Sequence, residues 1–139
     1  MMDIVVLIGR VLFVIIFLTS AAGHLTQPKG MAGYAQSKGV PAPTAAVFVS
    51  GIVLALGGLS VLLGIWPDLG ALLLVVFLVP TALLMHSFWQ ESEGEARQTE
   101  MIQFNKDIGL AGAALMLFAF FAATPDLGLT ITGPLFTIV

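Results

Sequence analysis

Residues 55–74 read ALGGLSVLLGIWPDLGALLL, two apolar runs on either side of a short turn. Pro67 and Gly70 punctuate this turn, and so short a connection makes the two runs antiparallel neighbours. The runs extend outward to about residues 44–66 and 69–89. A helix needs about 20 apolar residues to cross a bilayer core of about 30 Å. The stretch therefore predicts a transmembrane helical hairpin.

The composition of the whole chain agrees with a membrane setting. Of its 139 residues, 58% are hydrophobic and only 9% are charged, whereas soluble domains carry about 25% charged residues. So few charges cannot cover a globular surface, and we expect the lipid bilayer to be the main solvent. The net charge is −3 and there is no basic stripe, so nucleic acid is not an expected partner.

Two further apolar stretches, at about residues 4–25 and 104–123, complete a set of four spans. The first is not typical of a cleaved signal peptide, because it is long, is preceded by Asp3 and contains Arg10. The predicted fold is an all-α membrane protein, a four-transmembrane-helix bundle formed by a single domain over residues 1–139.

Residues 124–139 form a short apolar C-terminal tail, broken by Gly133 and Pro134. The tail is too short to span a bilayer as a helix. We expect it to lie along the membrane interface or to dock on a partner protein.

The basic residues predict the orientation of the bundle, because loops rich in Lys and Arg stay in the cytoplasm. The first connection, about residues 24–43, and the third, about residues 90–103, share one end of a four-span bundle. The two long loops are therefore expected in the cytoplasm and both termini outside. Lys29, Lys38, Arg97 and Lys106 lie in or beside the long loops, and Asp3, Asp68 and Asp126 lie at the opposite end.

Polar residues converge at the predicted cytoplasmic ends of the helices. His86 and Asp107 fall at similar depth and are expected to pair, so that the imidazole can accept or donate a proton at the membrane edge. Trp, His, Asn and Lys also serve as ordinary interfacial anchors, which is the alternative for this group. The glutamates of ESEGEARQTE, residues 91–100, are expected to face water in a solvated connector.

Arg10 is the costliest residue in the first span. We expect its side chain to reach the outer interface, towards Asp68 or Asp126. The alternative is a functional role within the membrane.

The chain has no cysteine, which excludes a disulfide, a thiolate nucleophile and an iron–sulfur cluster held by this chain. No metal centre is predicted. The two histidines, His24 and His86, raise the alternative of a b-type haem with two axial imidazoles, which we disfavour because two is the bare minimum.

Small residues are expected to let helices approach closely in lipid. Two such patches are Gly51, Ala55 and Gly58 in the second span, and Gly109, Gly112 and Ala113 in the fourth.

Several segments together resemble the DoxX family of small four-helix membrane proteins. They are GRVLFVIIFLTSAAGHL (residues 9–25), YAQSKGVP (34–41), ALGGLSVLLGIWPDLGALLL (55–74), HSFWQ (86–90) and QFNKDIGLAGAALML (103–117). The resemblance covers nearly the whole chain. It implies a bacterial inner-membrane location and a redox-linked role, because relatives include a subunit of thiosulfate:quinone oxidoreductase and proteins thought to act in oxidative-stress defence.

The resemblance also suggests functional positions. Arg10, His86, Asn105 and Lys106 occupy the family's recurring polar positions, and Gly57 and Gly58 its glycine pair. Many relatives place an acidic residue three positions before that pair, where this chain has Leu54. Chemistry that needs that carboxylate is therefore not expected here.

The leading functional hypothesis is an accessory subunit of a membrane redox assembly that hosts a quinone and binds a larger membrane or redox protein, or a second copy of itself. One alternative is a catalytic quinone oxidoreductase subunit, and another is a small-molecule transporter. The candidate cofactor-binding residues are Arg10, His86, Trp89, Asn105 and Lys106, and the candidate catalytic residues are His86 and Asp107.

Overall fold

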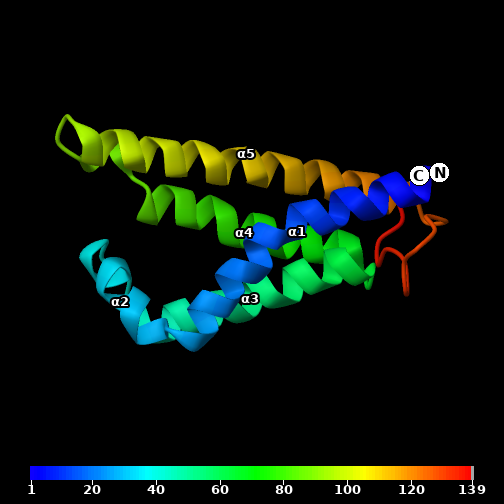
Figure 1. Cartoon of the computed structure of the whole chain (residues 1–139), viewed down its shortest axis with the longest axis horizontal. Helices are drawn as coiled ribbons and strands as arrows, with labels where there is room; N and C mark the ends of the chain where they lie inside the picture. The colour runs from blue at the N-terminus through cyan, green and yellow to red at the C-terminus, as the bar shows by residue number, and fades with distance from the viewer. Residues whose placement is uncertain (139) are drawn as a thin grey trace.

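A computed structural model describes residues 1–138 of the chain, which fold into a bundle of helices (Figure 1). Four of the helices are long and apolar enough to cross a membrane, as the sequence predicted. The elements are α1 (Met2–Thr26), α2 (Pro28–Ser37), α3 (Pro43–Leu63), α4 (Pro67–Met85), the short 3-10 helix η1 (Phe88–Gln90) and α5 (Glu95–Ala123).

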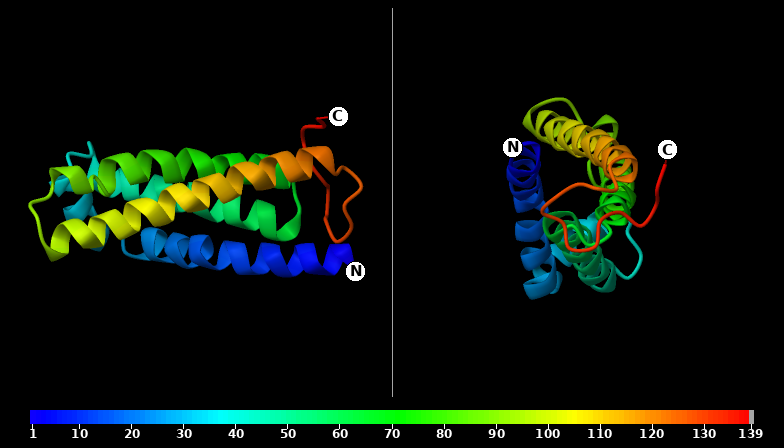
Figure 2. Two further views of the ribbon diagram at one scale, coloured as in Figure 1. Left: turned by 90° about the horizontal axis from the view of Figure 1, so that it is seen from above. Right: turned by 90° about the vertical axis from the view of Figure 1, so that its right-hand side faces the viewer.

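The long helices pack in a consecutive order, α1 along α3, α3 along α4 and α4 along α5. Figure 2 shows this arrangement from above and from one end of the bundle. The apolar core lies between the helices, with Leu54, Val61 and Leu74 fully buried. Outward apolar side chains such as Leu12 and Met116 stay 66% and 70% exposed, as lipid-facing residues of a membrane bundle do.

The α3–α4 hairpin turns differently from the sequence prediction. Gly64 ends α3 with φ of 66°, and Pro67 is the first residue of α4. Gly70, which was predicted to punctuate the turn, lies inside α4 instead. A Cβ atom there would lie 2.5 Å from Ser60 Cβ on α3, so Gly70 permits close contact between the two helices.

Two connections that were predicted as loops contain helix. The first holds α2, which begins with Pro28 at a position where its missing N–H is not needed. In the second, α5 begins at Glu95 rather than near residue 104, so the prediction of a loop was wrong from Glu95 onwards. Residues 92–99 are nevertheless exposed, as expected of a solvated connector. Gly94 supplies the backbone conformation before the helix, with φ of 121°, and Glu, Ala, Arg and Gln favour helix after it.

The C-terminal tail folds back on the α3–α4 turn of its own chain. The Trp66 N–H donates to the Gly133 carbonyl at 3.1 Å. The buried Asp68 carboxylate accepts hydrogen bonds from the N–H groups of Leu135 at 2.8 Å and Phe136 at 2.7 Å. Part of the tail is therefore held by its own bundle, although the side chains of Leu135 and Phe136 remain exposed.

Arg10 is buried at this same end, with 2% of its surface exposed. Its Nε donates to the Val61 carbonyl and its Nη1 to the Leu129 carbonyl, both at 2.8 Å, and its Nη2 donates to the Leu62 carbonyl. The prediction that Arg10 reaches towards Asp68 or Asp126 was wrong. The last carbonyls of a helix lack intrahelical partners and carry partial negative charge, so the end of α3 offers the guanidinium acceptors close by.

The two small-residue patches have different surroundings. A Cβ atom at Gly51 would lie 2.8 Å from His24 Cβ on α1, and one at Gly58 would lie 2.8 Å from Leu18 Cδ2. This patch therefore serves the α1–α3 contact. At Gly109 and Gly112, by contrast, an added Cβ would meet nothing within 4 Å. The patch on α5 faces outward.

These surroundings predict different effects of the same substitution on the free energy of unfolding. We expect Gly51→Leu to lower the free energy of unfolding by about 1–3 kcal/mol, because overpacking forces α1 and α3 apart. Gly112→Leu is the matched control and should change it little. Detergent-denaturation titrations of the two variants check this expectation, and equal losses in both would contradict the assigned packing.

Candidate functional site

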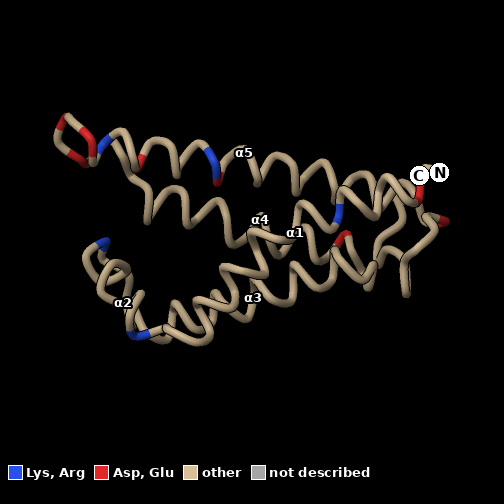
Figure 3. The backbone as a smooth tube through the Cα atoms, viewed as in Figure 1, with Lys and Arg blue, Asp and Glu red and all other residues tan. Residues whose placement is uncertain are grey.

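The two long connections meet at one end of the bundle, opposite the two termini (Figure 1). Lys38 Nζ, just after α2, lies 3.0 Å from Glu91 Oε1, just after η1. Figure 3 shows charged residues on α2, on the α4–α5 connection and on the first half of α5, with few along the middle of the bundle. The predicted sharing of one end by these connections is confirmed.

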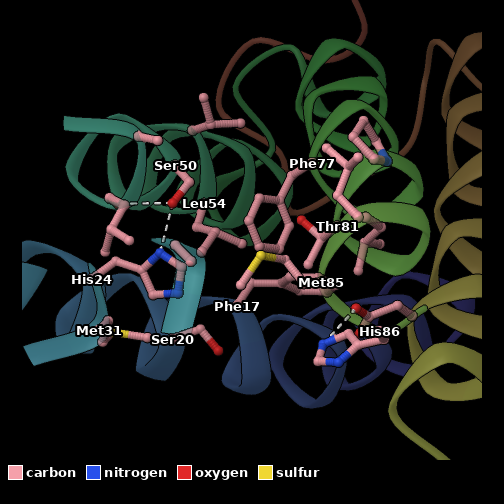
Figure 4. Close-up of a pocket in the computed structure, with 18 of the residues that line it drawn as sticks. Phe17, Ser20, His24, Met31, Ser50, Leu54, Phe77, Thr81, Met85 and His86 are labelled. Atoms are coloured by element: carbon pink, nitrogen blue, oxygen red, sulfur yellow. Dashed lines mark hydrogen bonds and ion pairs between the residues drawn. The ribbon is translucent and has the colours of Figure 1, made fainter. Parts of the chain in front are cut away.

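A cavity of about 650 Å³ opens among the helices at this end. Its walls are mainly apolar, with Phe17 from α1, Leu54 from α3 and Phe77 from α4 among them (Figure 4). All the long helices and α2 contribute to the lining. The polar residues that line it are Ser20, His24, Tyr34, Ser50, Thr81, His86, Lys106 and Asp107.

His86 lies between two carboxylates of α5. Its Nδ1 is 2.7 Å from Glu100 Oε2, and its Nε2 is 3.6 Å from Asp107 Oδ2. The second distance is too long for a hydrogen bond. The expected proximity of His86 and Asp107 is observed, and the stronger partner of the imidazole is Glu100.

Tyr34 ties α2 to the α4–α5 side of the cavity. Its hydroxyl lies 2.9 Å from the Met85 carbonyl and also contacts the Glu100 carboxylate. Burial and the adjacent Glu100 carboxylate raise the pKa of Tyr34, so the phenol keeps its donor hydrogen at neutral pH. Tyr34, Glu100 and His86 thus form a continuous polar chain, in which Tyr34 and His86 line the cavity and Glu100 joins them.

His24 belongs to a second polar group, on the α1–α3 side of the cavity. Its Nδ1 lies 2.7 Å from Ser50 Oγ, and Ser50 Oγ donates to the Val47 carbonyl at 2.7 Å. The Phe77 ring meets the imidazole edge-on, with 6.1 Å between ring centroids. Figure 4 shows His24 and His86 on opposite sides of the space, with Phe77, Thr81 and Met85 between them.

The structure brings together only some of the predicted site residues. His86, Asp107 and Lys106 line the cavity, with Lys106 Nζ 2.6 Å from Gln103 Oε1 and 3.5 Å from Asp107 Oδ1. Trp89 is 49% exposed and is not among the lining residues. It packs instead on Phe104, with ring centroids 5.6 Å apart.

The remaining two candidates lie away from the cavity. Asn105 is exposed on α5. Arg10 contacts the C-terminal end of α3, which adjoins the start of α4, whereas His86 follows the other end of the 19-residue α4. A helix of that length measures about 28 Å, so Arg10 does not share a site with His86.

Tyr34, Ser50 and Glu100 were missing from the sequence-based site. Glu100 was assigned to a solvated connector, yet it lies seven positions before Asp107. On a helix this spacing places two residues on one face, two turns apart. Had α5 been extended back through the helix-favouring residues EARQ, the sequence would have placed Glu100 beside Asp107.

Leu54 stands where many relatives are expected to carry an acid. It is fully buried and lines the cavity. The position of the missing carboxylate therefore adjoins the cavity, and here it contributes an apolar wall.

Comparisons with known proteins identify a family and two relatives of this chain. The sequence model of the DoxX family matches residues 5–87. The inner membrane protein YphA of Escherichia coli K12 is 28% identical over 114 residues, covering 82% of this chain and 81% of YphA. The inner membrane protein YqjF of the same strain is 31% identical over 118 residues, covering 83% of this chain and 82% of YqjF. No solved structure matches.

A helical bundle with four membrane-crossing helices and these matches define the chain as an integral membrane protein. The protein belongs to the DoxX family.

The contacts of Tyr34 predict the behaviour of α2. We expect Tyr34→Phe to increase amide hydrogen exchange across α2 about fivefold, because one hydrogen bond of about 1 kcal/mol is lost from the contact with Met85 and Glu100. Hydrogen-exchange mass spectrometry on the protein in nanodiscs measures this. Gln36→Ala, an exposed change on the same helix, is the control. Unchanged exchange in Tyr34→Phe would show that other contacts hold α2.

Proposed function

We propose that this protein is an accessory subunit of a membrane redox assembly and that its cavity holds a quinone. One observation carries the proposal. The cavity of about 650 Å³ has apolar walls and carries histidine-containing polar groups on two of its sides. Cavities of about 300–1,000 Å³ with few, well-placed polar groups are typical small-molecule sites.

The residues present fit a quinone. Its ring needs an apolar slot, which Phe17, Leu54 and Phe77 provide. Its ring oxygens need hydrogen-bond donors, which His86 and Lys106 can provide on one side of the cavity. Apolar side chains on the same walls suit a prenyl tail. A quinone brings reversible two-electron, two-proton chemistry, and this chain would bind and orient it.

The accessory role rests on what the sequence contains. The chain has no cysteine to hold an iron–sulfur cluster. Electrons would therefore come from a partner protein, in line with the redox assemblies that the family resemblance implies. The outward patch at Gly109 and Gly112 is a surface where a helix of such a partner, or of a second copy, could approach closely.

The charge distribution supports an orientation. The end with the cavity carries Lys29, Lys38, Arg97 and Lys106, whereas the other end has only the buried Arg10. By the positive-inside rule, the cavity end faces the cytoplasm and both termini face outside.

A second function is favoured by the surroundings of His86. An imidazole between Glu100 and Asp107, lining the cavity, is suited to exchange protons with a bound quinone. In that case the chain would be a catalytic quinone oxidoreductase subunit with His86 as the proton-exchanging group. None of the contacts described for the cavity adds support to the third hypothesis, a small-molecule transporter.

Blocking the cavity should abolish quinone binding. Thr81 lines the cavity, so the larger phenylalanine side chain should fill part of it. We expect Thr81→Phe to remove the thermal stabilisation that decylubiquinone gives the protein in nanodiscs. At about 100 times its Kd, a ligand stabilises the folded state by about 2.7 kcal/mol. Leu83→Phe is the matched control, because Leu83 is on the same helix, 49% exposed and outside the lining. Stabilisation that survives in Thr81→Phe would place the quinone elsewhere.

Purification separates the accessory function from the catalytic one. Mass spectrometry of the protein, isolated gently in nanodiscs, is expected to find an oxidoreductase subunit in stoichiometric amount. In that purified assembly, His86→Ala should leave quinone reduction within about twofold of wild type if the chain is an accessory subunit. A loss of about 100-fold or more would instead indicate catalysis by His86, since general acid–base groups contribute about 10²–10⁴-fold. A chain recovered without partner or quinone would contradict both functions.

A further inference from the structure

The contacts around His24 favour one position for its ring hydrogen. Ser50 Oγ lies 2.7 Å from the Val47 carbonyl, an acceptor to which its hydroxyl donates within the helix. With the Ser50 hydrogen placed there, the oxygen accepts at the 2.7 Å contact with His24 Nδ1. We therefore assign the ring hydrogen of neutral His24 to Nδ1.

The other ring nitrogen is left as an acceptor. In a neutral imidazole one nitrogen donates and the other accepts, so His24 Nε2 offers a lone pair. Within residues 1–138 no hydrogen bond reaches Nε2, and no side-chain nitrogen or oxygen there is both fully buried and unpaired. His24 Nε2 is thus accessible, and His24 lines the cavity (Figure 4).

His86 differs from His24 in the surroundings of its second ring nitrogen. Its Nδ1 donates to the Glu100 carboxylate at 2.7 Å, and its Nε2 faces the Asp107 carboxylate at 3.6 Å. The Asp107 carboxylate favours a hydrogen on that nitrogen, whereas His24 Nε2, within the described residues, has no such neighbour among its hydrogen bonds. The His24 side of the cavity is therefore the side that offers a ligand an acceptor.

We propose that His24 selects a hydroxyl-bearing ligand, so that the cavity prefers the reduced quinol to the oxidised quinone. This inference rests on the proposed quinone function and deepens it. A quinol presents O–H groups that can donate to His24 Nε2, whereas a quinone presents carbonyl oxygens that only accept. A carbonyl facing the Nε2 lone pair would leave two acceptors opposed in an apolar cavity, which is unfavourable.

The test compares three probes that share their other ring substituents and their tail and differ in the oxidation or methylation of the two ring oxygens. They are decylubiquinol, decylubiquinone and the 1,4-dimethoxy derivative of the quinol, each measured anaerobically by thermal stabilisation in nanodiscs. We expect the quinol to bind about five- to tenfold more tightly than the other two, the difference that one hydrogen bond of about 1 kcal/mol makes. His24→Phe keeps a ring at this position without the acceptor, and should bind all three probes alike.

Two other outcomes would test the preference for quinol and the existence of the quinone site separately. Equal affinities in the wild type would overturn the preference for quinol and leave the quinone site standing. The absence of stabilisation by all three probes would overturn the quinone site as well.

Two spectra keep the inference testable even if His24→Phe does not fold. Nitrogen-15 spectra of histidine-labelled protein read the tautomer directly, and a hydrogen on Nε2 of neutral His24 would overturn the proposal. A haem absorption band in the purified protein, lost in His24→Phe or shown to involve His24, would overturn it too, because Nε2 would then be bound to iron.

Discussion

A single buried cation holds together the end of the bundle where the chain begins and ends. Hydrocarbon offers no hydrogen bonds, so polar groups inside a membrane protein must find partners within the protein. The Arg10 guanidinium joins carbonyls of Val61 and Leu62, at the end of α3, to that of Leu129 in the tail. The Asp68 carboxylate on α4 also holds the tail, by accepting hydrogen bonds from the N–H groups of Leu135 and Phe136. The tail is therefore tied to α1, α3 and α4 at this end, whereas the cavity of about 650 Å³ lies towards the opposite end.

The two ends of the bundle are built on different principles. At the end with the termini, Arg10 and Asp68 are bonded to backbone groups, and small residues bring α3 and α4 into close contact. At the cavity end, α2 stands apart from the α4–α5 hairpin and is joined to it through Tyr34 and Lys38 (Figure 1). Polar side chains from different helices line the cavity there, as they do in small-molecule binding sites.

The sequence was sufficient for the four spans, because apolar stretches of membrane-crossing length are a strong signal. It was also sufficient for the meeting of His86 and Asp107, since both lie at helix ends of equal depth. Prediction from the sequence failed where contacts between distant segments determine the position of a side chain. Arg10 was assigned to carboxylates because charge suggests ion pairs, yet its partners are carbonyls that no pattern of residue types reveals. Glu100 was missed because charged residues near Gly94 were taken for a loop.

The length of α5 has a mechanical consequence. Its 29 residues measure about 44 Å, which exceeds a bilayer core of about 30 Å. The first turns of α5 are mostly exposed and continue without a break into the rest of the helix. Glu100 and, two turns further along, Asp107 are therefore fixed to the same rigid rod. A tilt of α5 would move both acids around His86 together.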